Sequence, residues 1–211
     1  RQCLAEAGAD LERLRIERAE YDDTWARDFG PISVAEDGHT RLLDFRFTGW
    51  GHKFPAQRDD ALNAALPWRA PREPVDLVLE GGAIDTDGRG TLLTPRACLR
   101  NPNRNPLLTE AELSERLRAT LGVERIWWLD HGELEGDDTD AHVDTLARFV
   151  NADTLAYVGC DDRQDPHYAD LAEMARELEA LTAGHGLKLA RLPMATPQYN
   201  AEGERLPATY A

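Results

Sequence analysis

Lysine and cysteine are both scarce in this chain of 211 residues. Lysine occurs only as Lys53 and Lys188, which leaves little room for covalent chemistry on a lysine amine. The three cysteines, Cys3, Cys98 and Cys160, are too few and odd in number for a disulfide scaffold. They favour a reducing compartment, and we therefore expect a cytoplasmic protein.

Basic charge and long apolar runs are also lacking. The chain has 24 Lys and Arg against 39 Asp and Glu, which gives a net charge of -15. Such a field repels phosphate backbones and anionic membranes and attracts cations. No segment approaches the roughly 18 successive apolar residues of a membrane span. We therefore expect no nucleic-acid partner, no membrane partner and no transmembrane segment, whereas a small cation is a suitable ligand. A homo-oligomer is left open.

The length fits one domain over residues 1–211. The chain opens at Arg1, without a Met, inside an expected helix, and it closes at Ala211 without a clear end to the fold. We therefore expect an interior piece of a longer protein that lacks structural units at both ends.

One order of elements recurs three times: two strands joined by a turn, a helix and a closing strand. The expected ranges are strands 31–34 and 41–45, helix 55–66 and strand 75–79; then strands 83–85 and 91–93, helix 109–121 and strand 124–129; then strands 143–150 and 154–158, helix 167–181 and strand 187–192. A helix over 2–7 and a strand over 11–19 look like part of an earlier unit. The alternative is an α+β domain in which the repeat is accidental.

The second helix has the clearest boundary signals. Thr109 and Glu112 have the spacing of a capping box, and Leu108 and Leu113 that of a hydrophobic staple. Gly122 follows the last turn, where a left-handed residue often ends a helix.

The polar residues that suggest chemistry follow the closing strands, at the crossing into the next unit. Trp25 and Asp28 lie in the first crossing, Glu80 in the second, and His142 and Asp144 in the third. If the units are arranged around an axis, these three crossings converge on one place.

His142 and Asp144 are two residues apart at an expected strand start, which predicts that they point to one face. A carboxylate beside an imidazole raises its pKa and orients it, as a general acid–base requires. A structural pair is the alternative. A metal site is another, because Asp138 and Asp140 continue the alternation. Since only one histidine lies nearby, nitrogen donors are too few for zinc, and we expect no metal.

Trp25 and Asp28 pair an aromatic face with a carboxylate, which suits a planar cation. The alternative is that an arginine neutralises Asp28 and that Trp25 belongs to the core. Glu80 is followed by Gly81 and Gly82, which allow a backbone or a ligand to approach closely. Its alternative is a tight turn with an incidental Glu.

Three carboxylates around one histidine and one tryptophan favour a guanidinium or amidinium ligand. The central carbon of such a cation is electrophilic, and a thiolate is a natural nucleophile for it. Cys3 lies on an expected helix, and Cys98 and Cys160 follow second strands rather than crossings. We therefore expect these three to be core or neutral thiols, and the nucleophile to lie outside this chain.

Six runs in this sequence resemble the agmatine deiminase/bacterial peptidyl-arginine deiminase family of the guanidine-modifying (pentein) superfamily. They occur in family order over about residues 23 to 150: WARDFGP from Trp25, GWGHK from Gly49, LEGG from Leu79, DGRGTLL from Asp87, RNP from Arg104 and DTDAHVD from Asp138.

The resemblance implies an α/β fold, a pentein-type propeller of pseudo-symmetric β-β-α-β units, of which about three of five are present here. It also implies that Asp28 and Asp144 bind the guanidinium, that His142 is the general acid–base, that Glu80 is an active-site carboxylate and that Trp25 lines the pocket. No cofactor is implied.

The implied reaction is hydrolytic deimination, with agmatine as the favoured substrate and N-carbamoylputrescine and ammonia as products, a step of polyamine and putrescine biosynthesis. Two departures stand out: Ala141 replaces the usual Gly, and the chain ends before the family's C-terminal, glycine-rich motif with the catalytic Cys. The fragment alone is therefore expected to be inactive. Peptidyl-arginine or free-arginine deimination, a non-catalytic pentein binding protein and a metal-dependent hydrolase using the Asp-rich loop remain alternatives.

Overall fold

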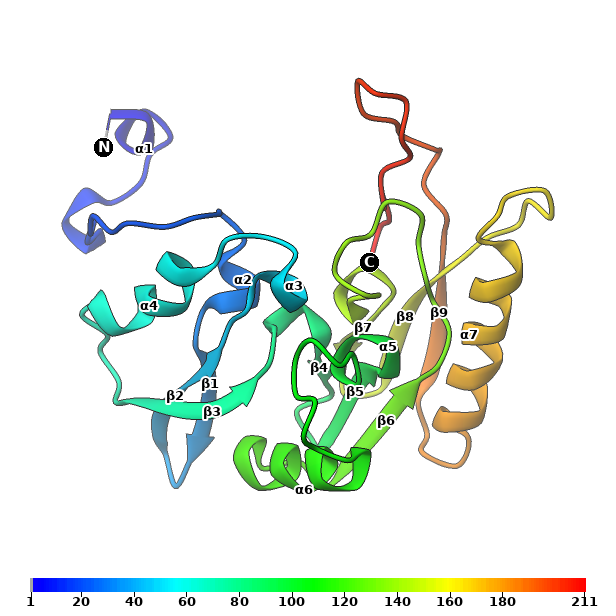
Figure 1. The fold of residues 1–211 in the computed structure, drawn as a ribbon, viewed down its shortest axis with the longest axis horizontal. Coiled ribbons are helices and arrows are strands. Elements are labelled where there is room, and N and C mark those ends of the chain that lie inside the picture. Colours follow the sequence, from blue (N-terminus) through cyan, green and yellow to red (C-terminus); the bar gives the residue numbers. More distant parts are fainter. Residues whose placement is uncertain (1) are drawn as a thin grey trace.

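The computed structural model describes residues 2–211 and contains three three-stranded sheets in succession (Figure 1). The first unit is β1 (Ile32–Glu36), β2 (His39–Arg46), α4 (Gln57–Ala65) and β3 (Arg72–Val78). The second is β4 (Asp85–Thr86), β5 (Thr91–Pro95), α6 (Glu110–Leu121) and β6 (Arg125–Leu129). The third is β7 (Ala147–Asn151), β8 (Thr154–Gly159), α7 (Tyr168–Thr182) and β9 (Lys188–Pro193).

Each sheet has the same topology. The first two strands pair antiparallel, as Ile32 does with Leu43, and the closing strand pairs parallel with the middle one, as Leu93 does with Trp127. The helix precedes the closing strand in every unit, as a parallel connection requires. The predicted β-β-α-β repeat is therefore confirmed, and the alternative of an accidental repeat is wrong.

Short helical segments occupy the connections and the region before the first unit, and sequence patterns predicted only one of them. They are α1 (Gln2–Glu6), α2 (Ala26–Phe29), α3 (Gly49–His52), α5 (Arg96–Leu99) and the 3₁₀ turns η1 (Leu11–Arg13), η2 (Gly81–Ala83) and η3 (Val143–Thr145). Only the helix expected over 2–7 was anticipated, and it corresponds to α1.

Two strand predictions need correction. The strand expected over 11–19 is absent, because residues 11–13 form η1 and residues 14–25 pair with no strand among those that the structure describes. A strand is stable only when a neighbour satisfies its backbone groups. The strand expected over 143–150 begins later, at Ala147, because η3 precedes it.

The boundary signals of the second long helix are confirmed. Thr109 and Glu112 form a reciprocal capping box at the start of α6. Gly122 adopts a left-handed conformation, with φ 69°, at its end.

The core consists of two main clusters and a small aromatic one. The largest lies around the third sheet, where Leu171, Met174 and Leu178 of α7 pack on the strands, as their helical spacing predicts. A second cluster joins the first two units through residues such as Leu43 and Leu92. The third cluster contains Phe29, Phe47 and Trp50, close to the candidate site.

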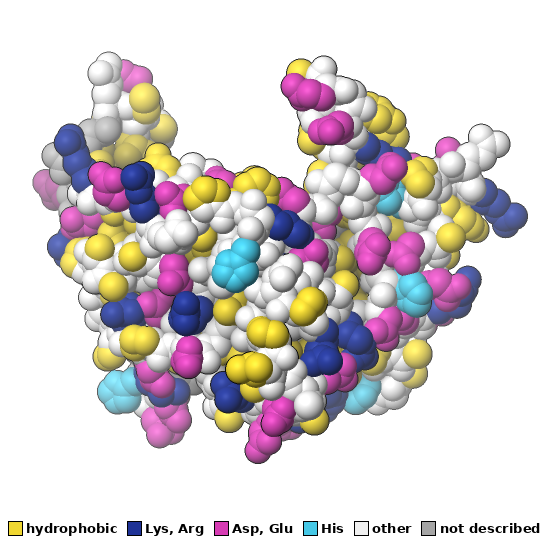
Figure 2. Space-filling view, viewed as in Figure 1, with side chains coloured by type: hydrophobic (Ala, Val, Ile, Leu, Met, Phe, Trp, Pro, Cys, Tyr) yellow, Lys and Arg dark blue, Asp and Glu magenta, His cyan; other side chains and the backbone are white. Residues whose placement is uncertain are grey.

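On the face shown in Figure 2, acidic and basic side chains are interspersed, and the acidic ones do not gather into a single patch. Among residues 2–211, no helix is both long enough and apolar enough to cross a bilayer.

Candidate active site

The three crossings meet, as their place in the repeat predicts. The segment α2 packs against η2, and η2 packs against η3. Gly82 in η2 lies at the meeting point. A Cβ atom on Gly82 would lie 2.5 Å from His142 Nδ1, 2.7 Å from Asp28 Oδ1 and 2.8 Å from Asp144 Oδ2. Only glycine fits there, and it lets three side chains from two segments surround one backbone position.

Gly81 has a separate steric role. Its Cβ would lie 2.0 Å from the carbonyl oxygen of Arg27, so the backbones of η2 and α2 are in direct contact. The glycine pair after Glu80 thus provides the close approach that the sequence predicts.

Asp28 comes from α2 and is 7% exposed. Its Oδ1 accepts a hydrogen bond from the Gly82 amide at 2.8 Å, and its Oδ2 accepts one from the indole Nε1 of Trp50 at 2.9 Å. Among the described residues no arginine or lysine pairs with Asp28, whereas the neighbouring Arg27 donates to the carbonyl of Ile84. The interpretation in which an arginine neutralises Asp28 is therefore wrong.

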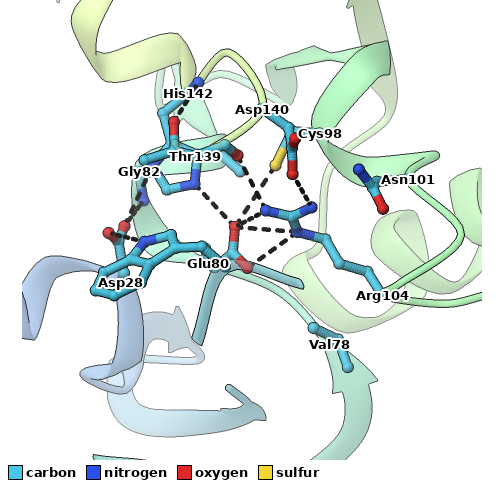
Figure 3. A network of polar contacts seen from close by, with 12 residues as sticks. Asp28, Val78, Glu80, Gly82, Cys98, Asn101, Arg104, Thr139, Asp140 and His142 are labelled. Atoms are coloured by element: carbon cyan, nitrogen blue, oxygen red, sulfur yellow. Dashed lines mark hydrogen bonds and ion pairs between the residues drawn. The ribbon is translucent and has the colours of Figure 1, made fainter. Parts of the chain in front are cut away.

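Glu80 is fully buried and lies at the centre of a polar network (Figure 3). Arg104 binds it through Nε at 2.9 Å from Oε1 and through Nη2 at 2.8 Å from Oε2. His142 Nε2 lies 2.8 Å from Oε2. Burial alone would raise the pKa of Glu80, but the hydrogen bonds from His142 and Arg104 outweigh it and lower this pKa. Glu80 is therefore an ionised carboxylate, and the interpretation of an incidental Glu in a turn is wrong.

His142 is 2% exposed and comes directly before η3. Because the ionised Glu80 accepts from Nε2–H, the other ring nitrogen, Nδ1, is free for proton transfer. Nδ1 lies 3.5 Å from Asp28 Oδ1. Burial would lower the pKa of His142, but the bond to Glu80 and the charges of Asp28 and Asp144 outweigh it and raise this pKa.

Asp144 shares this space with Asp28, although the two come from different units. Burial raises the pKa of Asp144, and the charge of Asp28 raises it further, while His142 opposes the change. Strand alternation was the wrong reason for expecting His142 and Asp144 on one face, because Asp144 lies in the 3₁₀ turn η3. The turn nevertheless directs both side chains toward Gly82.

Trp25 lies at the start of α2 and is 62% exposed. The interpretation of Trp25 as a core residue is therefore wrong. Its role as a pocket-lining side chain remains a prediction.

Two carboxylates of the Asp-rich loop bind donors of the protein itself. Asp137 accepts hydrogen bonds from the amides of Thr139 and Ala141. Asp140 binds Lys53 Nζ at 2.8 Å and Arg104 Nη1 at 2.7 Å. Two cationic side chains already bind Asp140. The alternating side chains from Asp138 to Asp144 therefore do not form the metal site that their spacing allowed.

The described residues contain one group with metal-ligand spacing, Glu80, Cys98 and His142, in which the ligating atoms lie within 4.8 Å of one another. Arg104 binds both oxygens of Glu80 there, so its positive charge opposes a cation. The donor set therefore fits an acid–base network better than a metal.

All three cysteines are free thiols. Cys98 lies in α5, fully buried, with its Sγ 3.6 Å from Glu80 Oε2. Burial raises the pKa of Cys98 well above its usual value, and the charge of Glu80 raises it further. Burial also raises the pKa of Cys160. Both thiols are therefore neutral near pH 7, as expected, although the contact between Cys98 and Glu80 was not anticipated.

Sequence reasoning assigned no role to Arg104 or Trp50, yet each holds a carboxylate of the site. Both lie in runs that carry the family resemblance. Arg104 and Trp50 were therefore visible in the sequence as members of these runs. Their spacing along the chain, however, did not link Arg104 to Glu80 or Trp50 to Asp28.

Several known proteins are similar to this chain in sequence and fold. An agmatine deiminase of Pseudomonas aeruginosa is 39% identical over 211 residues, covering 95% of this chain and 57% of that protein. The structure of a cysteine-to-serine variant of C. jejuni agmatine deiminase with substrate bound superposes with a TM-score of 0.89 at 39% identity, covering 100% of this chain and 62% of that one. The agmatine deiminase of Enterococcus faecalis gives a TM-score of 0.77 at 28% identity, covering 92% of this chain and 58% of that one.

This chain thus spans less than two thirds of the length of these relatives. A model of the Porphyromonas-type peptidyl-arginine deiminase family matches residues 1–211, the entire chain. The chain belongs to this deiminase family.

Proposed function

We propose that this chain provides the guanidinium-binding and acid–base residues of a deiminase that hydrolyses agmatine to N-carbamoylputrescine and ammonia. One observation carries the proposal: Asp28, Asp144 and His142 surround Gly82, and Glu80 binds the far side of the imidazole. Relatives named agmatine deiminase, including one with substrate bound, support it.

Asp28 and Asp144 would bind the guanidinium between them. Each supplies a carboxylate to N–H groups of the planar cation, which fixes its plane and exposes the central carbon. The raised pKa of Asp144 reflects burial and the charge of Asp28. A bound guanidinium would lower this pKa again and favour the ionised form of Asp144.

His142 would transfer the protons. A thiolate attacks the guanidinium carbon, His142 gives a proton to the departing nitrogen, and ammonia leaves a thiouronium adduct. His142 then takes one proton from water as the water attacks. The carbon–sulfur bond breaks, the second proton of the water passes to solvent, where it converts the ammonia to ammonium, and the ureido product forms with the thiolate restored. Glu80 holds the imidazole through Nε2, which leaves Nδ1 for both transfers. These steps need no metal or organic cofactor.

The nucleophile would be a cysteine outside this chain. Cys98 and Cys160 are neutral thiols, and the substrate-bound C. jejuni relative carries a cysteine-to-serine change. We expect Cys98→Ser and Cys160→Ser in the full-length protein to keep turnover, and loss of turnover in either would assign the nucleophile to this chain.

Conservative variants of the two aspartates test the binding of the guanidinium. In the full-length protein, Asp28→Asn or Asp144→Asn should lower turnover of agmatine by at least about 100-fold while the fold remains, because each removes a charge-assisted contact at the reacting group. Ammonia release and circular dichroism would be measured together. Near-normal turnover in both variants would contradict the assignment.

His142→Ala tests the proton transfer. Steady-state turnover should be lost, and intact-mass spectrometry after mixing with agmatine should detect a covalent adduct if attack precedes the blocked step. Retained steady-state turnover would contradict the role of His142.

Peptidyl-arginine is the second candidate substrate, because the matching family is described by that activity. Ammonia release from agmatine, free arginine and an arginine-containing peptide, compared by kcat/KM, distinguishes the three. Agmatine is expected to give the highest kcat/KM.

We also propose a cytoplasmic location, because free thiols are typical of reducing compartments.

A further inference from the structure

Asp28 is held by neutral donors on both oxygens. The Gly82 amide binds Oδ1, and the indole N–H of Trp50 binds Oδ2. Neutral donors fix the orientation of a carboxylate without cancelling its charge, whereas an arginine would do both. The hydrogen bond from Trp50 therefore orients the Asp28 carboxylate without offsetting its negative charge.

The backbone that carries Trp50 is unusual. Gly49, Trp50, Gly51 and His52 all have positive φ, at 65°, 55°, 78° and 68°. The segment α3 is thus a left-handed turn, closed by bonds from the His52 amide to the Thr48 carbonyl and from the Lys53 amide to the Gly49 carbonyl. Two glycines adopt this conformation easily, but a tryptophan does not, because its Cβ crowds the following carbonyl.

The turn and the lysine that follows it also contact the third crossing and Arg104. Lys53 Nζ binds Asp140 Oδ1 at 2.8 Å and the Asp138 carbonyl at 2.6 Å, in the loop before His142. A Cβ on Gly51 would lie 3.3 Å from Nη1 of Arg104, the residue that holds Glu80. The strained turn is therefore anchored at the site through Gly51 and Lys53, which follow Trp50.

Packing explains where the indole ring lies but not where its N–H points. The ring of Trp50 makes edge-to-face contacts with Phe47, at 5.0 Å between centroids, and with Phe54, at 5.6 Å. A phenylalanine could fill most of this space on a relaxed backbone. Strain in a left-handed aromatic residue is characteristic of functional sites, where the surrounding structure maintains it.

We propose that Trp50 is a positioning residue for Asp28: the left-handed turn Gly49–His52 aims its indole N–H at Oδ2, which orients the carboxylate to receive the guanidinium. This inference rests on the proposed function, in which Asp28 binds the substrate. The assignment concerns an interaction made before substrate arrives, so it predicts effects on substrate binding and on turnover, with little effect on folding.

The test replaces only the N–H group. Benzothienylalanine at position 50, in the full-length protein, keeps the two-ring shape of tryptophan and lacks the donor, and Trp50→Phe is the genetically encoded counterpart. For a hydrogen bond to a charged group, we expect kcat/KM for agmatine to fall about 10- to 100-fold, with a higher KM and a lower kcat. The benzothienylalanine protein should remain folded under the assay conditions, with a urea midpoint lowered only by the loss of one hydrogen bond to a buried carboxylate.

Trp127→Phe is the matched control. Trp127 is as buried as Trp50, at 4% exposure for each, but it lies on β6 and packs against Phe149 and His185. Its replacement should lower the urea midpoint without changing kcat/KM. If Trp50→Phe fails to fold, the benzothienylalanine protein decides the question.

The outcomes separate this inference from the proposed function. A fall in kcat/KM of at least 10-fold in a benzothienylalanine protein that is folded under the assay conditions supports the positioning role. If the benzothienylalanine protein keeps kcat/KM within twofold while Asp28→Asn is inactive, Trp50 has no positioning role and the function of Asp28 stands. If Asp28→Asn is itself active, the proposed function fails, and the role of Trp50 fails with it.

Discussion

Replacing Arg104 by methionine should destabilise the protein far more than the loss of an ordinary ion pair. The side chains of Arg104 and Glu80 are both completely buried. Arg104 also binds Asp140 and donates to the Thr139 carbonyl at 3.0 Å. Its guanidinium therefore compensates one fully buried carboxylate and one partly buried carboxylate.

The size of the effect follows from what is left behind. Without Arg104, Glu80 keeps only His142 and the weak thiol donor of Cys98. Removing one partner of a buried pair typically costs about 3–5 kcal/mol, because the remaining charge is buried without compensation. Arg104→Met should therefore lower the free energy of unfolding by about that amount at pH 7.

Urea unfolding of the full-length protein, followed by tryptophan fluorescence, measures this loss. Arg89→Met is the matched control, since Arg89 binds Asp153 in a pair with side-chain exposures of 65% and 71% and should cost at most about 1 kcal/mol. The double variant Glu80→Gln with Arg104→Met should recover part of the stability, because it leaves no unpaired charge at Glu80.

The pH dependence gives a second test of the same reasoning. In the wild type the pKa of Glu80 lies below its ordinary value of 4.5, so its stabilisation is present above that pH and is lost only in stronger acid. In Arg104→Met the pKa of Glu80 should be raised, because burial remains and the guanidinium is gone. The deficit relative to wild type should therefore grow between about pH 4 and pH 7. A deficit as small as that of Arg89→Met, or one independent of pH, would refute the argument.

Three further variants probe the same region. Gly82→Ala should abolish turnover and destabilise the fold by about 1–3 kcal/mol in urea unfolding, because its Cβ would lie 2.5 Å from His142 Nδ1; wild-type kinetics would contradict the close approach. Ala141→Gly should raise the free energy of unfolding by about 0.5–1 kcal/mol. Ala141 has φ 68°, and the relief of its left-handed strain exceeds the entropy that glycine adds to the unfolded chain. A lower urea midpoint would show that the strain is absent. Protonated His142 should stabilise the fold fully below its ordinary pKa of 6.5 and progressively less as the pH rises through its higher folded value. The stability advantage of wild type over His142→Asn should thus decline as the pH rises above about 6.5, and a constant advantage would contradict the raised pKa.

The repeat was predictable because its signals are local. Apolar strands, paired turn residues and the Thr109–Glu112 cap each act over a few residues, so their order along the chain was enough to define three units. The failures came where a distant partner decides the structure. Residues 11–19 have an extended pattern but no neighbouring strand among residues 2–211, and η3 replaces the beginning of an expected strand.

The four ionisable residues of the site were found from their position in the repeat. Glu80, His142 and Asp144 follow the closing strands β3 and β6, and Asp28 precedes β1 at the equivalent point of the repeat, so an arrangement that brings equivalent points together gathers them. Their protonation states were not predictable, because burial and partners determine them. The low pKa of Glu80 depends on His142 and on Arg104, which is distant from both in sequence.

Residues that act through a neighbour are hidden from sequence reasoning for a related physical reason. A substrate-binding carboxylate is recognisable by its chemistry, but the group that orients it needs only one donor, and any of several residue types can supply that donor. Trp50 reaches Asp28 through a left-handed turn, and Arg104 reaches Glu80 across 24 residues. Two glycines flanking a tryptophan were the available signal, since that pattern permits positive φ on both sides of a large aromatic residue. Such a pattern near a predicted site therefore favours a positioning role over a place in the core.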